Sequence, residues 1–158
     1  MLRPASLYKN ELRKCFLELS YDEDMFYYTG SFENSVPEIL DNQDGSLYQY
    51  AIVDDEDNVI GYFTYRINWY ASSVSQFGLF SFYKNCPTIG IDVYREIKRI
   101  ICQYHIHRIE WRMIGGNPVE KHYDRFCNRY NGRKLILKDA IRNKNGKYCD
   151  DIIYEILI

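Results

Sequence analysis

The order of a strand, a helix and a second strand in the middle of the chain constrains the fold most strongly. Residues 76–82 are rich in β-forming side chains, and residues 91–104 carry apolar side chains at helical spacing. Residues 106–114 then alternate apolar and charged side chains, as a strand buried on one face does. Strands joined in this way pair in parallel with a right-handed crossover, and ligands of such sheets bind at the carboxyl ends of the strands.

The flanking segments predict further strands and helices on both sides of this unit. A helix start is expected at Asn117, because an Asn cap is followed by Pro118 and then by Glu120, three residues after the cap. The other expected elements are a strand at 2–4, a helix at 5–19, a short helix with loops at 22–42, a hairpin from 46–53 and 59–70, and a closing hairpin from 135–141 and 148–158.

Length and composition indicate one α/β domain. The chain has 158 residues and is 46% hydrophobic, which suffices for a single domain over residues 1–158. A formal net charge of -2 provides no basic field for phosphate backbones, so we expect no nucleic-acid partner. No apolar run approaches the roughly 20 residues that span a bilayer, and residues 1–10 lack the apolar core of a signal peptide. We therefore expect no membrane partner and a cytoplasmic protein.

Cysteine and histidine do not predict a metal site. The 5 cysteines stand far apart and never form a CxxC pair, which argues against a disulfide framework and against structural zinc. His105 and His107 lie two residues apart on an expected strand, but no third ligand accompanies them. The sequence therefore predicts no metal.

Three local segments carry a family resemblance. Residues 2–5 read LRPA, residues 59–63 read VIGYF, and the tail combines LKDAI at 137–141 with NGKYCDDIIY at 145–154. Together with the order of expected elements, these segments resemble the GNAT superfamily of N-acetyltransferases. The resemblance implies an α/β (α+β) fold, with a mixed central sheet of about six to seven strands, a splayed parallel strand pair and flanking helices.

The resemblance also implies an activity and a co-substrate. Members of this family transfer an acetyl group from acetyl-CoA to an amine of a small molecule or a protein by direct attack. The pantetheine arm would pair with the free backbone of the first parallel strand, and the pyrophosphate would lie at the start of the following helix. The acetyl-CoA-binding residues implied are Phe80, Ser81 and Phe82 on the strand, Thr88, Ile89, Gly90 and Ile91 at the helix start, and Asn117.

The loop before that helix departs from the family pattern. Relatives usually carry Gln or Arg, two residues, Gly, one residue, and then Gly or Ala, whereas residues 85–90 keep only the final Gly90. Pro87 has no N–H to donate, Thr88 brings a β-branched side chain, and Asp92 adds a negative charge. Two interpretations of Gly90 stay open: it contacts the pyrophosphate, or it merely permits the turn into the helix.

Tyr123 is the candidate catalytic acid that the resemblance implies, on the helix that starts at Asn117. A phenol with an ordinary pKa of about 10 stays protonated at neutral pH and can donate a proton to a departing thiolate. Tyr123 can instead be a core residue, and Asn117 can act mainly as a helix cap. Tyr130, two turns further on, is the second candidate acid.

Glu110 is the candidate base. It lies on the second strand of the expected pair and could accept a proton from the amine through water. An acid between Arg108 and Arg112 is also typical of a solvated strand face. On the acceptor side, the carboxylates at 22–24 would attract a cationic amine.

A second class of function also stays open. A catalytically inactive GNAT-like module could use a tyrosine-rich surface to bind a protein partner, and the residues expected there on one partly exposed strand are Tyr62, Tyr65, Trp69 and Tyr70. A binder of single-stranded nucleic acid would need a basic groove that the sequence does not indicate. The sequence leaves open whether the protein forms a homodimer.

Overall fold

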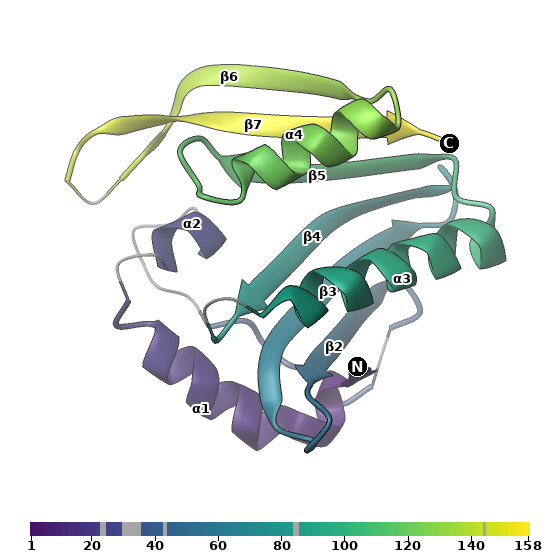
Figure 1. Ribbon diagram of the computed structural model, residues 1–158, viewed down its shortest axis with the longest axis vertical. Coiled ribbons are helices and arrows are strands. Elements are labelled where there is room, and N and C mark those ends of the chain that lie inside the picture. Colours follow the sequence, from purple (N-terminus) through teal and green to yellow (C-terminus); the bar gives the residue numbers. More distant parts are fainter. Residues whose placement is uncertain (23–24, 30–35, 43, 84–85, 144) are drawn as a thin grey trace.

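In the part of the chain that the structure describes, seven strands form one mixed sheet in the order β1-β2-β3-β4-β5-β7-β6 (Figure 1). This computed structural model describes residues 1–158 except 23–24, 30–35, 43, 84–85 and 144. The predicted acceptor-side residues Glu23 and Asp24, and Asn85 of the loop, therefore lie outside the described residues. The strands are β1 (Leu2–Pro4), β2 (Leu47–Val53), β3 (Val59–Asn68), β4 (Ser73–Ser81), β5 (Arg108–Ile114), β6 (Arg133–Arg142) and β7 (Tyr148–Leu157).

Helices cover both faces of the sheet. One face carries α3 (Pro87–Tyr104) and α4 (Glu120–Arg129), and the other carries a 3-10 turn (Ala5–Tyr8), α1 (Lys9–Leu19) and α2 (Met25–Thr29). Among the described residues, no helix is both long enough and apolar enough to span a membrane. The three-layer arrangement follows from the sequence order, because the strand–helix–strand crossover must return on one face.

The central strand β3 is buried on both faces. Tyr62 and Phe63 are each 1% exposed, yet they belong to different apolar clusters, one under α1 and one under α3. Successive side chains of a strand point to opposite faces, so one strand serves two cores. Burying an aromatic ring of this size stabilises the fold by about 2–3 kcal/mol, and β3 therefore anchors the sheet.

The predicted α/β fold is confirmed, with small shifts in the bounds of its elements. The first helix divides into the 3-10 turn and α1, and β4 begins at Ser73 rather than at residue 76. α3 begins at Pro87, earlier than residue 91, because proline suits the first helical position. In the closing hairpin, β7 pairs antiparallel with β5, which leaves β6 at the edge.

Candidate active site

β4 and β5 pair in parallel only at their first residues. Ser73 lies opposite Arg108 and Val74 opposite Ile109, and the described residues form no further pair between the two strands. β4 stays paired with β3 as far as Ser81, while β5 stays paired with β7. The strands therefore diverge toward their carboxyl ends, as Figure 1 shows, and the splayed pair expected from the sequence is present.

A β-bulge in β4 follows the paired residues. Thr64 and Arg66 on β3 are two residues apart, whereas their partners on β4, Gly78 and Ser75, are three apart. The bulge contains Gln76, whose φ of 54° is left-handed, and Arg66 donates a 3.2 Å hydrogen bond from Nε to Gln76 Oε1. A bulge bends its strand and increases the twist. This one therefore accounts for the turn of β4 away from β5.

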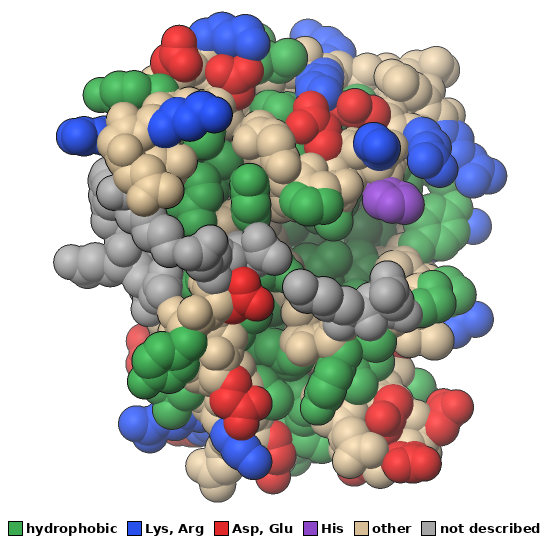
Figure 2. All heavy atoms as spheres, turned by 60° about the vertical axis from the view of Figure 1, so that its left-hand side comes forward, with side chains coloured by type: hydrophobic (Ala, Val, Ile, Leu, Met, Phe, Trp, Pro, Cys, Tyr) green, Lys and Arg blue, Asp and Glu red, His purple; other side chains and the backbone are tan. Residues whose placement is uncertain are grey.

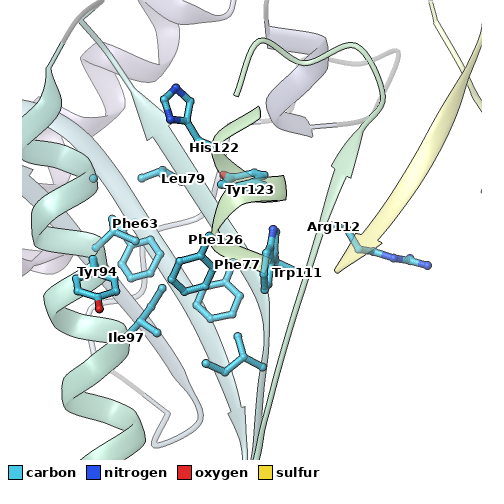
Figure 3. Close-up of a pocket in the computed structure, with 13 residues that line it drawn as sticks. Phe63, Phe77, Leu79, Tyr94, Ile97, Trp111, Arg112, His122, Tyr123 and Phe126 are labelled. Atoms are coloured by element: carbon cyan, nitrogen blue, oxygen red, sulfur yellow. The ribbon is translucent and has the colours of Figure 1, made fainter. Parts of the chain in front are cut away.

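An apolar cavity of about 240 Å³ lies on the α3 and α4 side of the diverging strands. Figure 2 shows the hollow, with hydrophobic side chains on its floor, and Figure 3 shows how the strands and the two helices surround it. The apolar residues that line it include Phe77 and Leu79 of β4, Val93 and Ile97 of α3, Trp111 of β5 and Phe126 of α4.

The edge of β4 that faces the open side carries backbone groups without hydrogen-bond partners among the described residues. The Phe82 amide donates a 3.0 Å hydrogen bond to the Ile60 carbonyl at the start of β3. Hydrogen-bonded pairs alternate along an antiparallel ladder, so Phe80 also turns its backbone groups to β3. Leu79 and Ser81 then turn theirs toward β5, from which β4 has diverged. These two residues supply the donors and acceptors of the open edge.

The strand residues expected to hold acetyl-CoA divide between the two sides of the sheet. Phe80 and Phe82 point to the α1 side, where both rings meet Phe16 edge-on at centroid distances of 5.1 and 5.3 Å. Of the three expected residues, only Ser81 turns its backbone to the open edge. The sequence did not predict Leu79 as a residue of the open edge. The alternation of apolar and polar side chains shows which face of a strand is buried, but not which edge of its backbone lacks a hydrogen-bond partner.

Tyr123 reaches the cavity from α4. Its ring packs edge-on against Trp111 and Tyr154, with centroids 6.0 and 6.1 Å apart, and Figure 3 shows its hydroxyl turned toward Leu79. No hydrogen bond to another described residue involves this hydroxyl. Burial, and then the nearby Tyr28, raise the pKa of Tyr123 above its ordinary value of 10.0. The phenol is therefore protonated at neutral pH and able to donate.

Solved structures of N-acetyltransferases share this fold. Spermidine N-acetyltransferase from Vibrio cholerae, in complex with CoA and spermine, has a TM-score of 0.75 and 18% identity over 99% of this chain and 94% of that chain. RimL, a ribosomal L7/L12 α-N-protein acetyltransferase in complex with coenzyme A, has a TM-score of 0.72 and 15% identity over 99% and 93%. The chain has the GNAT fold.

The likeness lies in the fold rather than in close sequence similarity. A further solved structure matches with a TM-score of 0.55 and 16% identity, and this chain spans only 59% of its length. No protein-family model and no curated protein matches the sequence. The resemblance carried by three short segments is confirmed at the level of the GNAT fold.

The start of α3 offers few free backbone donors. Pro87 is its first residue and has no N–H, and the Ile89 amide donates a 3.2 Å hydrogen bond to the residue before the helix. Gly90 and Ile91 are the fourth and fifth residues, so their amides bond within the helix. Among the four residues expected to bind pyrophosphate here, Thr88 alone keeps an amide without a helical partner.

Gly90 lies at the cavity, but the backbone does not require a glycine there. A Cβ added at Gly90 would meet nothing within 4 Å, and its φ is not left-handed. These two observations argue against the interpretation that Gly90 merely permits the turn into the helix. The negative charge of nearby Asp92 is offset by two cationic partners, because its carboxylate lies 2.8 Å from the Met1 amino group and 3.5 Å from the Arg95 guanidinium.

Asn117 acts in the turn before α4. Its Oδ1 accepts a 3.1 Å hydrogen bond from the Val119 amide, and α4 begins at Glu120 rather than directly after Asn117. Glu120 reaches back to the Gly116 amide at 3.3 Å, one residue before the cap expected from the sequence. Asn117 does not line the cavity. It is also not the cap expected from the sequence, because Val119 is the residue before α4 and no side chain caps the helix; Asn117 stabilises the preceding turn instead.

Tyr130 is held outside the cavity. Its hydroxyl lies 2.8 Å from that of Tyr94, so the two tyrosines join α3 to α4. The second candidate acid therefore has a structural partner, whereas Tyr123 faces the cavity.

Glu110 faces away from the cavity. Its neighbours Ile109 and Trp111 both line the cavity, so the alternation of a strand places Glu110 on the opposite face. There it is paired with Arg108, which also lies 3.0 Å from Glu155. The structure does not bring Glu110 and Tyr123 together, because they approach the sheet from opposite faces.

The indole N–H of Trp111 is an orphan donor in the wall of the cavity. Trp111 is 8% exposed and stacks on Tyr154 with ring centroids 5.0 Å apart. Its Nε1 has no hydrogen-bond partner among the described residues. An unpaired buried donor costs about 1–3 kcal/mol, so a ligand that offered an acceptor here would recover that energy. Sequence patterning assigned Trp111 to the core and gave no sign of this role.

Proposed function

We propose that this protein is an N-acetyltransferase, which moves an acetyl group from acetyl-CoA to an amine of a small molecule or a protein by direct attack. The observation that carries the proposal is the apolar cavity where β4 and β5 diverge. Two solved proteins with the same fold were crystallised with CoA, which supports this choice of ligand.

The residues of the cavity fit a pantetheine arm. Its amides would pair with the open backbone of Leu79 and Ser81, as an added strand pairs with a sheet edge. Its methylene and dimethyl groups would contact the apolar walls, including Val93 and Phe126. The orphan N–H of Trp111 offers one further donor for a carbonyl of the arm.

Tyr123 would act as the general acid of the transfer. The amine nitrogen attacks the thioester carbon, a C–N bond forms, and the C–S bond breaks as the tetrahedral intermediate collapses. The sulfur leaves as a thiolate, and the Tyr123 hydroxyl donates the proton that makes it a thiol. Two observations support this role: the hydroxyl faces the cavity, and the raised pKa of Tyr123 keeps it protonated at neutral pH.

The acceptor amine would enter from the α1 and α2 side. On this side Tyr28 of α2 stacks on Phe80 with centroids 5.0 Å apart. The attacking amine must lose a proton, and Glu110 faces this side of the sheet with its side chain 31% exposed. We keep Glu110 as the candidate that relays this proton through water.

Calorimetry with acetyl-CoA tests the donor half of the proposal, and a thiol-release assay with an amine panel tests the other half. The panel should contain spermidine and a peptide with a free N-terminal alanine, because solved neighbours are named for such acceptors. We expect acetyl-CoA to bind and at least one amine to release CoA. Absence of binding at high micromolar acetyl-CoA would end the enzyme proposal.

A catalytically inactive binding module is the alternative, and one surface favours it. Trp69 and Tyr70, at the turn between β3 and β4, are 49% and 101% exposed. Tyr62 and Tyr65, expected from the sequence on the same surface, are instead buried in the core. Aromatic side chains this exposed are typical of interface hot spots. In the inactive case, Tyr70→Ala would abolish capture of a protein partner and acetyl-CoA would have no effect on it.

A further inference from the structure

Charged residues are sorted to opposite flanks of α4. Glu120 and Asp124 lie on the flank that faces β6, where both carboxylates contact the Lys134 ammonium at 2.9 and 2.7 Å. The acids of α4 are therefore paired with Lys134 on the side away from α3.

The other flank of α4 is basic. His122, Arg125 and Arg129 are spaced by three and four residues, so they lie along one stripe of the helix, and all three are exposed. We call this stripe the basic lip. His122 lines the cavity, and no carboxylate of the described residues lies within 4 Å of the Arg125 or Arg129 guanidinium. The basic lip is thus a row of positive charge without internal partners.

The basic lip borders the groove between α4 and α3. In the sheet order β4-β5-β7-β6, the flank of α4 away from β6 is the one nearer to β4 and α3. Across the groove, the Lys98 ammonium lies 5.5 Å from the centroid of the Tyr94 ring. The hydrogen bond from Tyr130 lowers the pKa of Tyr94, and the charges of Lys98 and Arg129 add to this lowering. Positive charge therefore acts on the groove from both helices.

This local positive charge stands out because the whole chain has a net charge of -2. It also lies beside a helix start that is poor in donors, since Pro87 lacks an N–H and Ile89 bonds to the preceding residue. An anionic ligand that enters the cavity would find few backbone donors on α3 and several side-chain cations on α4.

We propose that the basic lip binds the phosphates of the nucleotide end of CoA. It would replace the phosphate contacts that the loop before α3, which departs from the family pattern, does not supply. The inference rests on the proposed function, because it assumes that CoA occupies the cavity. Arginine suits this task, since its guanidinium stays charged and donates two parallel hydrogen bonds to phosphate oxygens.

The test compares three ligands by calorimetry: CoA, dephospho-CoA and pantetheine. The variants are Arg125→Ala, Arg129→Ala and, as the matched control, Arg13→Ala, an exposed arginine of α1 on the other face of the sheet. We expect each lip variant to weaken CoA roughly three- to tenfold, as loss of a partly exposed charge contact does. Pantetheine should bind the wild type and both lip variants equally, and Arg13→Ala should match the wild type.

The CoA ligands also locate the contact within the nucleotide. If dephospho-CoA binds the wild type as weakly as CoA binds the lip variants, the lip holds the 3′-phosphate. If dephospho-CoA loses affinity on mutation as CoA does, the lip holds the pyrophosphate. Both results support the proposal.

Two results would overturn it, and they differ from failure of the enzyme proposal. CoA affinity that is unchanged in both lip variants, or a loss that is equal for pantetheine, would remove the phosphate role while the transferase function stands. Absence of CoA binding to the wild type would remove both proposals together.

Discussion

Tyr65 on β3 donates a 2.6 Å hydrogen bond to the Glu96 carboxylate on α3. The same carboxylate accepts two 2.7 Å bonds from the Arg99 guanidinium, and Glu96 is only 8% exposed. Burial by itself would raise the pKa of Glu96, but the bonds from Arg99 and Tyr65 hold it below its ordinary value of 4.5. The hydrogen bond from Tyr65 thus ties α3, one wall of the cavity, to the sheet, and the half-exposed Arg99 on the same helix supplies the counter-charge.

Glu96→Gln should therefore destabilise the protein. It removes the negative charge that Arg99 faces in a partly buried site, and we expect a loss of roughly 2 kcal/mol in the free energy of unfolding at pH 7. Urea unfolding measures it, with Glu11→Gln on the exposed side of α1 as the control. Equal stability of Glu96→Gln and the wild type would mean that Arg99 is fully solvated.

The stability difference between the wild type and Glu96→Gln should depend on pH, and the direction of this dependence follows from the lowered pKa of Glu96. Because the pKa of Glu96 is lower in the folded state, its contribution is fully present above the unfolded value of about 4.5 and is lost as the pH falls through the folded pKa. The difference in unfolding free energy between the wild type and Glu96→Gln should be constant from pH 7 to 5 and shrink below that range. A difference that grows on acidification would contradict the assignment.

Gln76 is predicted to accept glycine but not valine. Its φ of 54° is strained for an L-residue and worse for a β-branched one, so Gln76→Val should lower the free energy of unfolding by about 2 kcal/mol. Gln76→Gly relieves the strain but loses the Arg66 bond and adds chain entropy, so it should stay within about 0.5 kcal/mol of the wild type. Urea unfolding separates the two, and Ser75→Val, at a residue paired in the ladder, is the control.

Tyr123→Phe should lower kcat by about a hundredfold and leave the KM for acetyl-CoA nearly unchanged, because it deletes a proton donor without changing the packing of the ring. Steady-state kinetics with a saturating amine measure both constants. Tyr130→Phe is the matched control, since Tyr130 does not line the cavity and its hydroxyl bonds to that of Tyr94. An unchanged kcat in Tyr123→Phe would transfer the acid role to water or to Tyr130.

Gly132→Ala should be strongly destabilising, whereas Gly90→Ala should be tolerated. A Cβ at Gly132 would lie 2.6 Å from the Glu155 carbonyl oxygen and 2.7 Å from Cys127 Sγ, and backbone cannot move aside cheaply. We expect a loss of about 2–3 kcal/mol for Gly132→Ala. Gly90→Ala meets nothing within 4 Å and should add up to about 1 kcal/mol through helix propensity. Thermal unfolding ranks the two variants.

The sequence by itself determined the order and type of the main elements, because hydrophobic periodicity is a local property. The alternation at residues 106–114 predicted β5, and the apolar spacing at 91–104 predicted most of α3. Their order implied the parallel pair that the structure contains. In the next helix, the apolar side chains at 119–130 also follow helical spacing, and they placed Tyr123 on the inner face of α4, where it lines the cavity.

Only the tertiary structure decided which groups meet at the site, because those contacts depend on partners distant in sequence. The bulge at Gln76 follows from the register with β3, and the open edge at Leu79 and Ser81 follows from the divergence of β5. The sequence pattern of a strand predicts neither the bulge nor the open edge, because successive side chains point to opposite faces whether or not the backbone has a hydrogen-bond partner. Likewise, the basic lip becomes distinct only in the folded chain, where Lys134 of β6 pairs with the acids on the other flank of α4.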